Sequence, residues 1–215
     1  MTNADSSSVG EIKVSGLGFV IIEPDLCNFN FVIASTKGTV ELANASAKKR
    51  YDYTEQELRN RRFKSANVVQ KADVVHEDTV FTSIFVFDVS QADIEESRGL
   101  LQHLQAKLGR YFQLGDLSCY ASEEKISTMR RSAVKMAVND AKNKAEIIAS
   151  AFGQRIRGLV RVTETETAIQ SITEEERALP PRRSVLMDLS SAIRAARQRL
   201  CVRLDAVCAL GEFTR

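Results

Sequence analysis

Residues 122–152 read SEEKISTMRRSAVKMAVNDAKNKAEIIASAF, and this stretch decides the fold. Alanine recurs at every fourth position, at Ala133, Ala137, Ala141, Ala145 and Ala149. Residues four apart lie on the same face of an α-helix, so the five methyl groups form a nearly straight strip. Alanine is also the strongest intrinsic helix former. The stretch therefore predicts a long helix, about 122–152, that lies flat on a β-sheet.

The segments outside this helix read as strands, hairpins and two more helices. Gly16 and Gly18 interrupt the first strand pattern, which indicates a bulge or a close backbone approach. Ser90 to Asp93 resembles a capping box that opens a helix. The order of hairpins and helices predicts an α+β fold, a two-layer sandwich whose antiparallel-rich sheet carries the helices on one face. The expected strands are two pieces between residue 11 and a break at Pro24, one on each side of the glycines, and then 25–35, 66–75, 79–89, 112–120, 157–166 and 199–210. The expected helices include 39–60 and a segment ending at residue 108.

One domain accounts for most of the chain. Residues 1–10 are polar and serine-rich, which predicts disorder. We expect a single domain over residues 11–210, because no linker or repeat divides it before residue 165. Residues 165–192 contain three consecutive glutamates and a Pro-Pro pair and lack the apolar density of a core element. This segment is predicted to be a mobile insertion.

Composition narrows the class of protein. The 215 residues include 30 basic and 28 acidic side chains, a formal net charge of +2, and no tryptophan. This balance gives no general attraction to nucleic acid or to an anionic membrane. The four cysteines form no CxxC pair, which favours free thiols in a reducing compartment. The first residues lack a signal-peptide pattern. We therefore expect a cytoplasmic location, with the nucleus as a second compartment.

The sequence offers little for catalysis or cofactor binding. Neither His76 nor His103 has cysteine or carboxylate partners at metal-ligand spacing. The thiolate of Cys119 could be stabilised by the N-terminus of the long helix, but a structural role is favoured because no histidine lies nearby in sequence. No nucleophile or phosphate-loop motif occurs. We expect no enzyme activity, no catalytic residue, no metal and no cofactor.

Two sets of residues are candidates for partner contact. The first is a phosphorylation or partner-binding loop in which hydroxyl side chains stand among acidic ones, where an added phosphate could switch a contact. The second is a basic helix surface, for which a solvated helix face is the simpler interpretation. The loop comprises Thr163, Thr165, Thr167, Ser171, Thr173, Glu174, Glu175 and Glu176, and the surface comprises Lys48, Lys49, Arg59, Arg61 and Arg62.

Several of these features together resemble one known family. The run Ile12-Lys-Val14-Ser15-Gly16-x-Gly18, followed by Pro24-Asp25, resembles the opening signature of the SIMPL-domain family, also called domain of unknown function 541. The alanine-rich helix, the glycine after it and the LVRVTE strand are similar to the C-terminal half of that family. The resemblance covers about residues 11–164 and 199–210. Within the family, the chain resembles the eukaryotic branch, because its sequence shows no export signal and contains a glutamate-rich insertion.

The resemblance implies a function that the residues alone do not show. It implies a non-enzymatic intracellular signalling adaptor that binds a receptor-associated kinase and promotes NF-κB-dependent transcription. No catalytic residue follows from it. The alternative is a self-assembling or stress-related scaffold of the same fold, a homo-oligomer that associates through an exposed strand edge. We expect protein partners in either case, and neither nucleic acid nor membrane.

Overall fold

The computed structural model describes residues 10–61, 63, 68–77, 80–172 and 185–212. The chain forms two compact units, each assembled from segments that are distant in sequence. Residues 1–22, 123–172 and 198–215 make the first unit, and residues 23–122 and 173–197 make the second. The expectation of a single domain over residues 11–210 stays a prediction.

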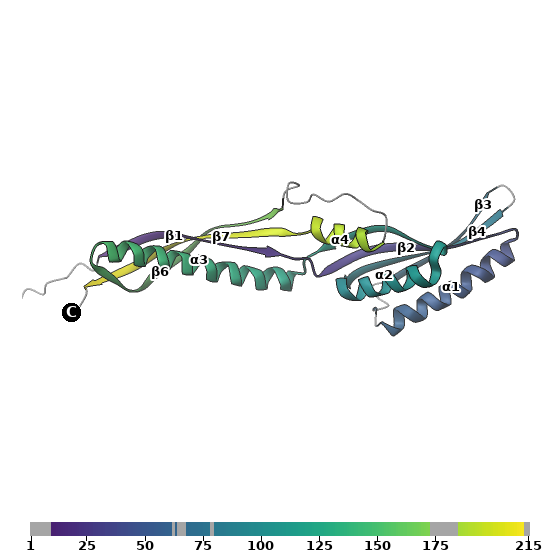
Figure 1. Ribbon diagram of the computed structural model, residues 1–215, viewed down its shortest axis with the longest axis horizontal. Helices are drawn as coiled ribbons and strands as arrows, with labels where there is room; N and C mark the ends of the chain where they lie inside the picture. The colour runs from purple at the N-terminus through teal and green to yellow at the C-terminus, as the bar shows by residue number, and fades with distance from the viewer. Residues whose placement is uncertain (1–9, 62, 64–67, 78–79, 173–184, 213–215) are drawn as a thin grey trace, which may run out of the picture. The chain divides into compact units, whose positions relative to one another are not determined.

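The first unit is a three-stranded antiparallel sheet covered by one helix (Figure 1). Helix α3 (Glu123–Ala151) packs against all three strands, and all five of its strip alanines are buried. The long helix and its small-residue face are confirmed. The strand order is β1-β7-β6, with β1 spanning Glu11–Ile22, β7 Gln198–Glu212 and β6 Gln154–Ser171.

Strand β1 is continuous, and two of its glycines let helix α3 pack closely against it. Residues at even positions of β1 face α3, and those at odd positions are exposed. A Cβ on Gly16 would lie 2.0 Å from the carbonyl oxygen of Ala137, and one on Gly18 the same distance from that of Ala133. Of the two interpretations of these glycines, the close backbone approach is correct. The bulge and the break between two strand pieces are wrong, because β1 pairs with β7 without a register shift.

The second unit contains a four-stranded antiparallel sheet of order β3-β4-β2-β5. Helices α1 and α2 pack on it (Figure 1), and α4 contacts α2 and β5. The strands are β2 (Leu26–Lys37), β3 (Val68–Glu77), β4 (Val80–Asp93) and β5 (Phe112–Tyr120), and the helices are α1 (Val40–Asn60), α2 (Ile94–Leu108), the 3-10 turn η2 (Gly109–Tyr111) and α4 (Val185–Ala195).

Aromatic rings fill the core of the second unit. The ring of Phe31 stacks on Phe87 with centroids 4.8 Å apart and meets Phe112 at 5.4 Å. Helix α2 contributes a buried face that includes Leu101 and Leu104. This burial of apolar side chains between sheet and helices is the main stabilising term of the unit.

The predicted α+β class with antiparallel sheets is confirmed, with two differences in detail. The segment 165–192 contains regular structure at both ends: β6 continues to Ser171, because β7 supplies backbone partners for a polar strand, and α4 begins at Val185. Residues 173–184 lie outside the described part. The cap of α2 is Asp93 rather than Ser90, because strand β4 runs on to Asp93.

Candidate functional site

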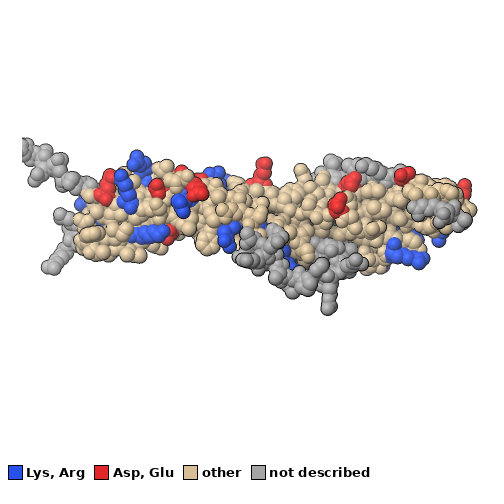
Figure 2. Space-filling model, turned by 90° about the horizontal axis from the view of Figure 1, so that it is seen from above, with Lys and Arg blue, Asp and Glu red and all other residues tan. Residues whose placement is uncertain are grey.

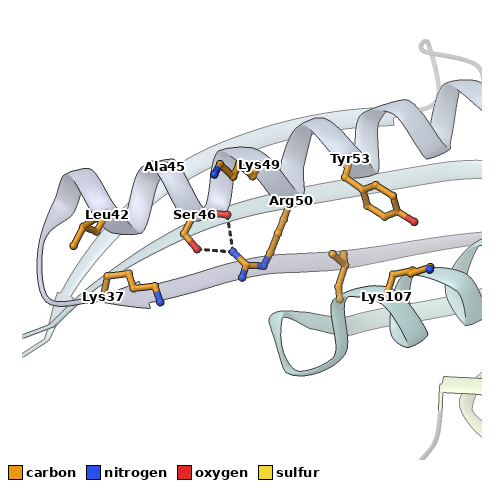
Figure 3. A pocket seen from close by; sticks show the side chains of 9 residues that line it. Lys37, Leu42, Ala45, Ser46, Lys49, Arg50, Tyr53 and Lys107 are labelled. Atoms are coloured by element: carbon orange, nitrogen blue, oxygen red, sulfur yellow. Dashed lines mark hydrogen bonds between the residues drawn. The ribbon is translucent and has the colours of Figure 1, made fainter.

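Helix α1 presents two neighbouring stripes, one to the core and one to a pocket. The helix begins at the N-cap Thr39, whose Oγ1 accepts a hydrogen bond from the amide of Leu42 at 3.3 Å. Its buried stripe holds small or apolar side chains that let it approach the sheet. The adjacent stripe lines a pocket of about 680 Å³, which Figure 3 shows between α1, the end of β2 and the end of α2. The lining residues are Lys37, Leu42, Ala45, Ser46, Lys49, Arg50, Tyr53, Lys107 and Leu108.

The pocket has a strongly basic character. Lys37, Lys49, Arg50 and Lys107 come from three different elements, and none of the nine lining residues is acidic. The remaining lining groups are mostly apolar, with the Tyr53 ring among them. A concave surface with several uncompensated cations and apolar walls favours an anionic ligand that also carries apolar groups.

Arg50 is held in place by contacts on two sides of its guanidinium. Its Nη1 donates hydrogen bonds of 2.6 Å to both the carbonyl oxygen and the Oγ of Ser46 (Figure 3). Its guanidinium carbon lies 3.7 Å from the centre of the Tyr111 ring, a cation–π contact. The Oγ of Ser46 in turn accepts a hydrogen bond from Ser35 at 2.9 Å. This side chain is therefore pre-positioned before any ligand arrives.

Tyr111 reports the positive potential beside the pocket. A hydrogen bond from Arg110 is the main cause that lowers the pKa of the Tyr111 phenol, and the charges of Arg110, Arg50 and Lys37 lower it further. Cations from the 3-10 turn, α1 and β2 thus act on one hydroxyl group. Like charges brought together in this way repel one another, and a bound anion would relieve the repulsion.

Only part of the predicted basic surface belongs to this pocket. Lys49 lines it, whereas Lys48, Arg59 and Arg61 each lie near a carboxylate four residues away on the same helix. Such pairs neutralise a helix face and stabilise it slightly. Arg62 lies outside the described residues. Lys37 and Lys107 were not predicted from the sequence, because β2 and α2 bring them to α1 only in the folded unit.

The predicted hydroxyl-rich loop is largely a strand. Thr163, Thr165, Thr167 and Ser171 lie in β6, where Thr165 donates to the carbonyl oxygen of Arg203 at 3.2 Å and Thr167 donates to Glu164. Thr173, Glu174, Glu175 and Glu176 lie outside the described residues. Phosphorylation of this segment stays a prediction.

A tyrosine, a histidine and a glutamate meet beside the pocket without forming a catalytic triad. The hydroxyl of Tyr53 lies 2.5 Å from Nε2 of His103, and Glu57 Oε2 lies 3.4 Å from that same nitrogen. A proton relay needs the nucleophile and the carboxylate on opposite ring nitrogens. Here both groups share one nitrogen, so the arrangement joins α1 to α2. His103 of α2 is therefore in contact with α1.

All four cysteines are free thiols, and Cys27 and Cys208 are buried. Cys119 is the register partner of Cys27 across β2 and β5, and burial raises its pKa to about 11. This environment opposes the thiolate, so the structural role of Cys119 is favoured over a nucleophilic one. Among the described residues, no three His, Cys, Asp or Glu side chains are grouped to hold a metal ion, and no described helix is both long and apolar enough to cross a membrane.

A second exposed surface lies in the first unit. Leu17, Phe19 and Ile21 alternate along β1 with the residues that face α3, and each is about half exposed. Basic and acidic side chains are interspersed on the part of this unit seen in Figure 2, in contrast to the single sign of the pocket lining.

Comparison with known sequences gives the family. A sequence model described as SIMPL, protein of unknown function (DUF541), matches residues 12–199. The chain belongs to the SIMPL family. The match begins in β1 and includes α3, so it contains the glycine and alanine contact described above.

Curated relatives of this SIMPL-family chain are distant. Interleukin-1 receptor-associated kinase 1-binding protein 1 of Mus musculus is 24% identical over 73% of this chain, and that of Homo sapiens is 23% identical over the same share. A homolog from Xenopus laevis is 22% identical over 73% of the chain. The alignments span 61%, 60% and 64% of the relatives' own lengths, so the chain matches about three fifths of each.

Proposed function

We propose that this chain is a non-enzymatic signalling adaptor that binds a receptor-associated kinase through the pocket on the second unit. In this proposal it acts in the cytoplasm, enters the nucleus and promotes NF-κB-dependent transcription. The names of the relatives support the kinase as partner. The pocket supports binding rather than catalysis, because its lining offers cations and apolar groups but no carboxylate or imidazole to act as a general base.

The single observation that carries the proposal is the uncompensated charge of the pocket. Four cations and no acidic residue line it, and none of the four forms an ion pair with a described carboxylate, whereas Lys48 and Arg59 elsewhere on α1 are paired. An acidic segment of a kinase would neutralise these four cations, and the apolar walls of the pocket would bury the side chains beside its acidic residues.

A pull-down with matched charge reversals tests this proposal. The immobilised chain is exposed to interleukin-1 receptor-associated kinase 1, and the retained kinase is measured. Lys49→Glu combined with Arg50→Glu should abolish retention. The control, Lys48→Glu combined with Arg59→Glu, changes the net charge of the same helix equally but lies outside the pocket lining. Circular dichroism confirms that both variants fold. Equal retention of the kinase by the two variants would show that the pocket is not the binding site. No retention by the unmodified chain would show that this kinase is not the partner.

A self-assembling scaffold is the second candidate function, and the apolar row of β1 favours it. Leu17, Phe19 and Ile21 form a half-exposed stripe on one sheet face, and a second copy could bury this stripe. Light scattering at increasing concentration should then show a mass above 23.9 kDa. Phe19→Lys should restore the monomer mass. A constant monomer mass over the whole concentration range would eliminate this candidate.

A further inference from the structure

The pocket on the second unit carries a sharper inference about its ligand. We propose that it recognises a phosphoryl group, carried on a serine or threonine of a protein segment. The identity of the protein rests on the function proposed above, whereas the phosphoryl chemistry rests on the pocket alone.

Arg50 offers the edge that a phosphoryl group needs. Its Nη1 is occupied by Ser46, and this fixes the plane of the guanidinium. Its Nη2 and Nε have no hydrogen-bond partner among the residues that the structure describes. Two parallel N–H groups of this kind bind two oxygens of one phosphoryl group, a bidentate contact that adds geometric selectivity to charge.

The charge of the surroundings favours a doubly charged anion over a carboxylate. Lys37 and Arg50 line the pocket, and both charges act on the Tyr111 hydroxyl together with Arg110. A phosphorylated side chain carries a charge of about −1.5 to −2 at neutral pH and three acceptor oxygens, whereas a carboxylate carries a single charge and two oxygens. Three neighbouring cations are therefore better neutralised by phosphate.

The apolar part of the lining favours a protein segment over free phosphate. Leu42 and Ala45 on α1 and Leu108 on α2 adjoin the cations, and the volume of about 680 Å³ exceeds what one phosphoryl group fills. Side chains beside the phosphorylated residue would bury this surface. Recognition of phosphorylated segments by arginine clusters is an established binding mode of other domains.

The recognition of a phosphoryl group is tested first. Inorganic phosphate is added to the full chain, and NMR spectra monitor its binding. Phosphate at pH 7.5 should shift the Nε–H resonance of Arg50, and acetate at equal ionic strength should leave it unchanged. The phosphate effect should weaken as the pH falls from 7.5, because the inorganic phosphate dianion gains a proton near neutral pH and loses one negative charge. Arg50→Gln should reduce the affinity about ten-fold or more, whereas Arg59→Gln, on the same helix but outside the pocket, should leave it unchanged. Equal responses to phosphate and acetate would overturn the proposal.

The protein ligand is tested with the kinase in two states. The chain is exposed to autophosphorylated interleukin-1 receptor-associated kinase 1 and to the same kinase after phosphatase treatment. Retention of the phosphorylated form alone supports the proposal. Pocket-dependent retention of both forms would overturn the phosphoryl inference but keep the adaptor function. Phosphate binding at Arg50 without retention of either form of the kinase would keep the phosphoryl inference but overturn the proposed adaptor function.

A third arm addresses the other polymer that carries phosphate. A fluorescent phosphoserine peptide with leucines on both sides of the phosphoserine competes with a single-stranded RNA octamer for the full chain. Displacement of the RNA by the peptide, but not by the unphosphorylated peptide, supports the proposal. Tighter binding of the RNA, with loss in Lys49→Gln and Arg50→Gln, would overturn it.

Discussion

Gly16 of β1 lies directly beneath Ala137 of α3, so closely that any side chain on the glycine would collide with the helix backbone. A Cβ at Gly16 would be 2.0 Å from the Ala137 carbonyl oxygen and 2.9 Å from the Cβ of Ala141. The contact therefore needs glycine in the strand and a small residue, alanine, in the helix. This contact sets the separation of helix and sheet in the first unit.

Gly16→Ala should therefore lower the free energy of unfolding by about 3 kcal/mol, because the new methyl group meets a helix backbone that cannot move aside locally. Urea denaturation measures the loss. Gly158→Ala is the control, since a Cβ on that β6 glycine has nothing within 4 Å, and its effect should stay within about 0.5 kcal/mol. Equal losses in the two variants would show that α3 is not in close contact with β1.

Asp140 should make stability depend on pH. Its carboxylate accepts hydrogen bonds from Lys144 Nζ at 2.6 Å and from the Leu17 amide at 2.9 Å, and these contacts lower its pKa. The folded-state pKa lies below the unfolded value of about 3.9, so the contribution is complete above that value and is lost as the pH falls through the folded pKa.

Asp140→Asn should accordingly be less stable than the unmodified chain at pH 7, and the difference should shrink below about pH 4. Urea midpoints across this range measure it. Glu146→Gln, on the same helix with a longer contact of 3.6 Å to Lys142, serves as the control. A difference between the Asp140 variant and the unmodified chain that persists unchanged at pH 2 would contradict the assignment.

The cap of α2 should be worth a measurable part of the stability. Asp93 Oδ1 accepts hydrogen bonds from the amides of Glu95 at 2.8 Å and Glu96 at 3.0 Å. Asp93→Ala removes both and should cost about 1 kcal/mol in thermal or urea unfolding. Asp93→Asn keeps an acceptor oxygen and should cost much less. If alanine and asparagine are equally tolerated, the cap contributes nothing.

Cys119 should react slowly with alkylating reagents in the folded protein. A pKa of about 11 leaves about one thiol in a thousand ionised at pH 8, and the thiolate is the reactive form. Labelling with iodoacetamide, followed by peptide mass spectrometry, should show a large rate increase for this cysteine in concentrated urea. Equal rates in folded and unfolded protein would contradict the burial of this thiol.

Parts of the molecule could be predicted from sequence because they repeat. The fourfold alanine spacing predicted α3, and the alternation from Cys27 to Ile33 predicted β2, since each pattern lies within one element. Segment 165–171 was misjudged for the opposite reason. It is polar on nearly every position, and only backbone pairing with β7 makes it a strand.

The pocket was found only in part. Lys49 was among the predicted basic residues, but Lys37 and Lys107 were not, since they lie on elements separated from α1 in sequence. Conversely, Lys48 and Arg59 were named as candidate binding residues although each has a carboxylate four positions away on the same helix. That spacing was visible in the sequence and could have excluded them.

The sequence by itself determined the secondary structure around its periodic segments, the small-residue face of the long helix and membership of the SIMPL family, because local propensity and side-chain spacing act over a few residues. Only the tertiary structure decided which cations stand together, which are neutralised and where a concave surface forms. Those properties depend on distances between side chains from separate elements, and electrostatic energy follows such distances rather than the order of the chain.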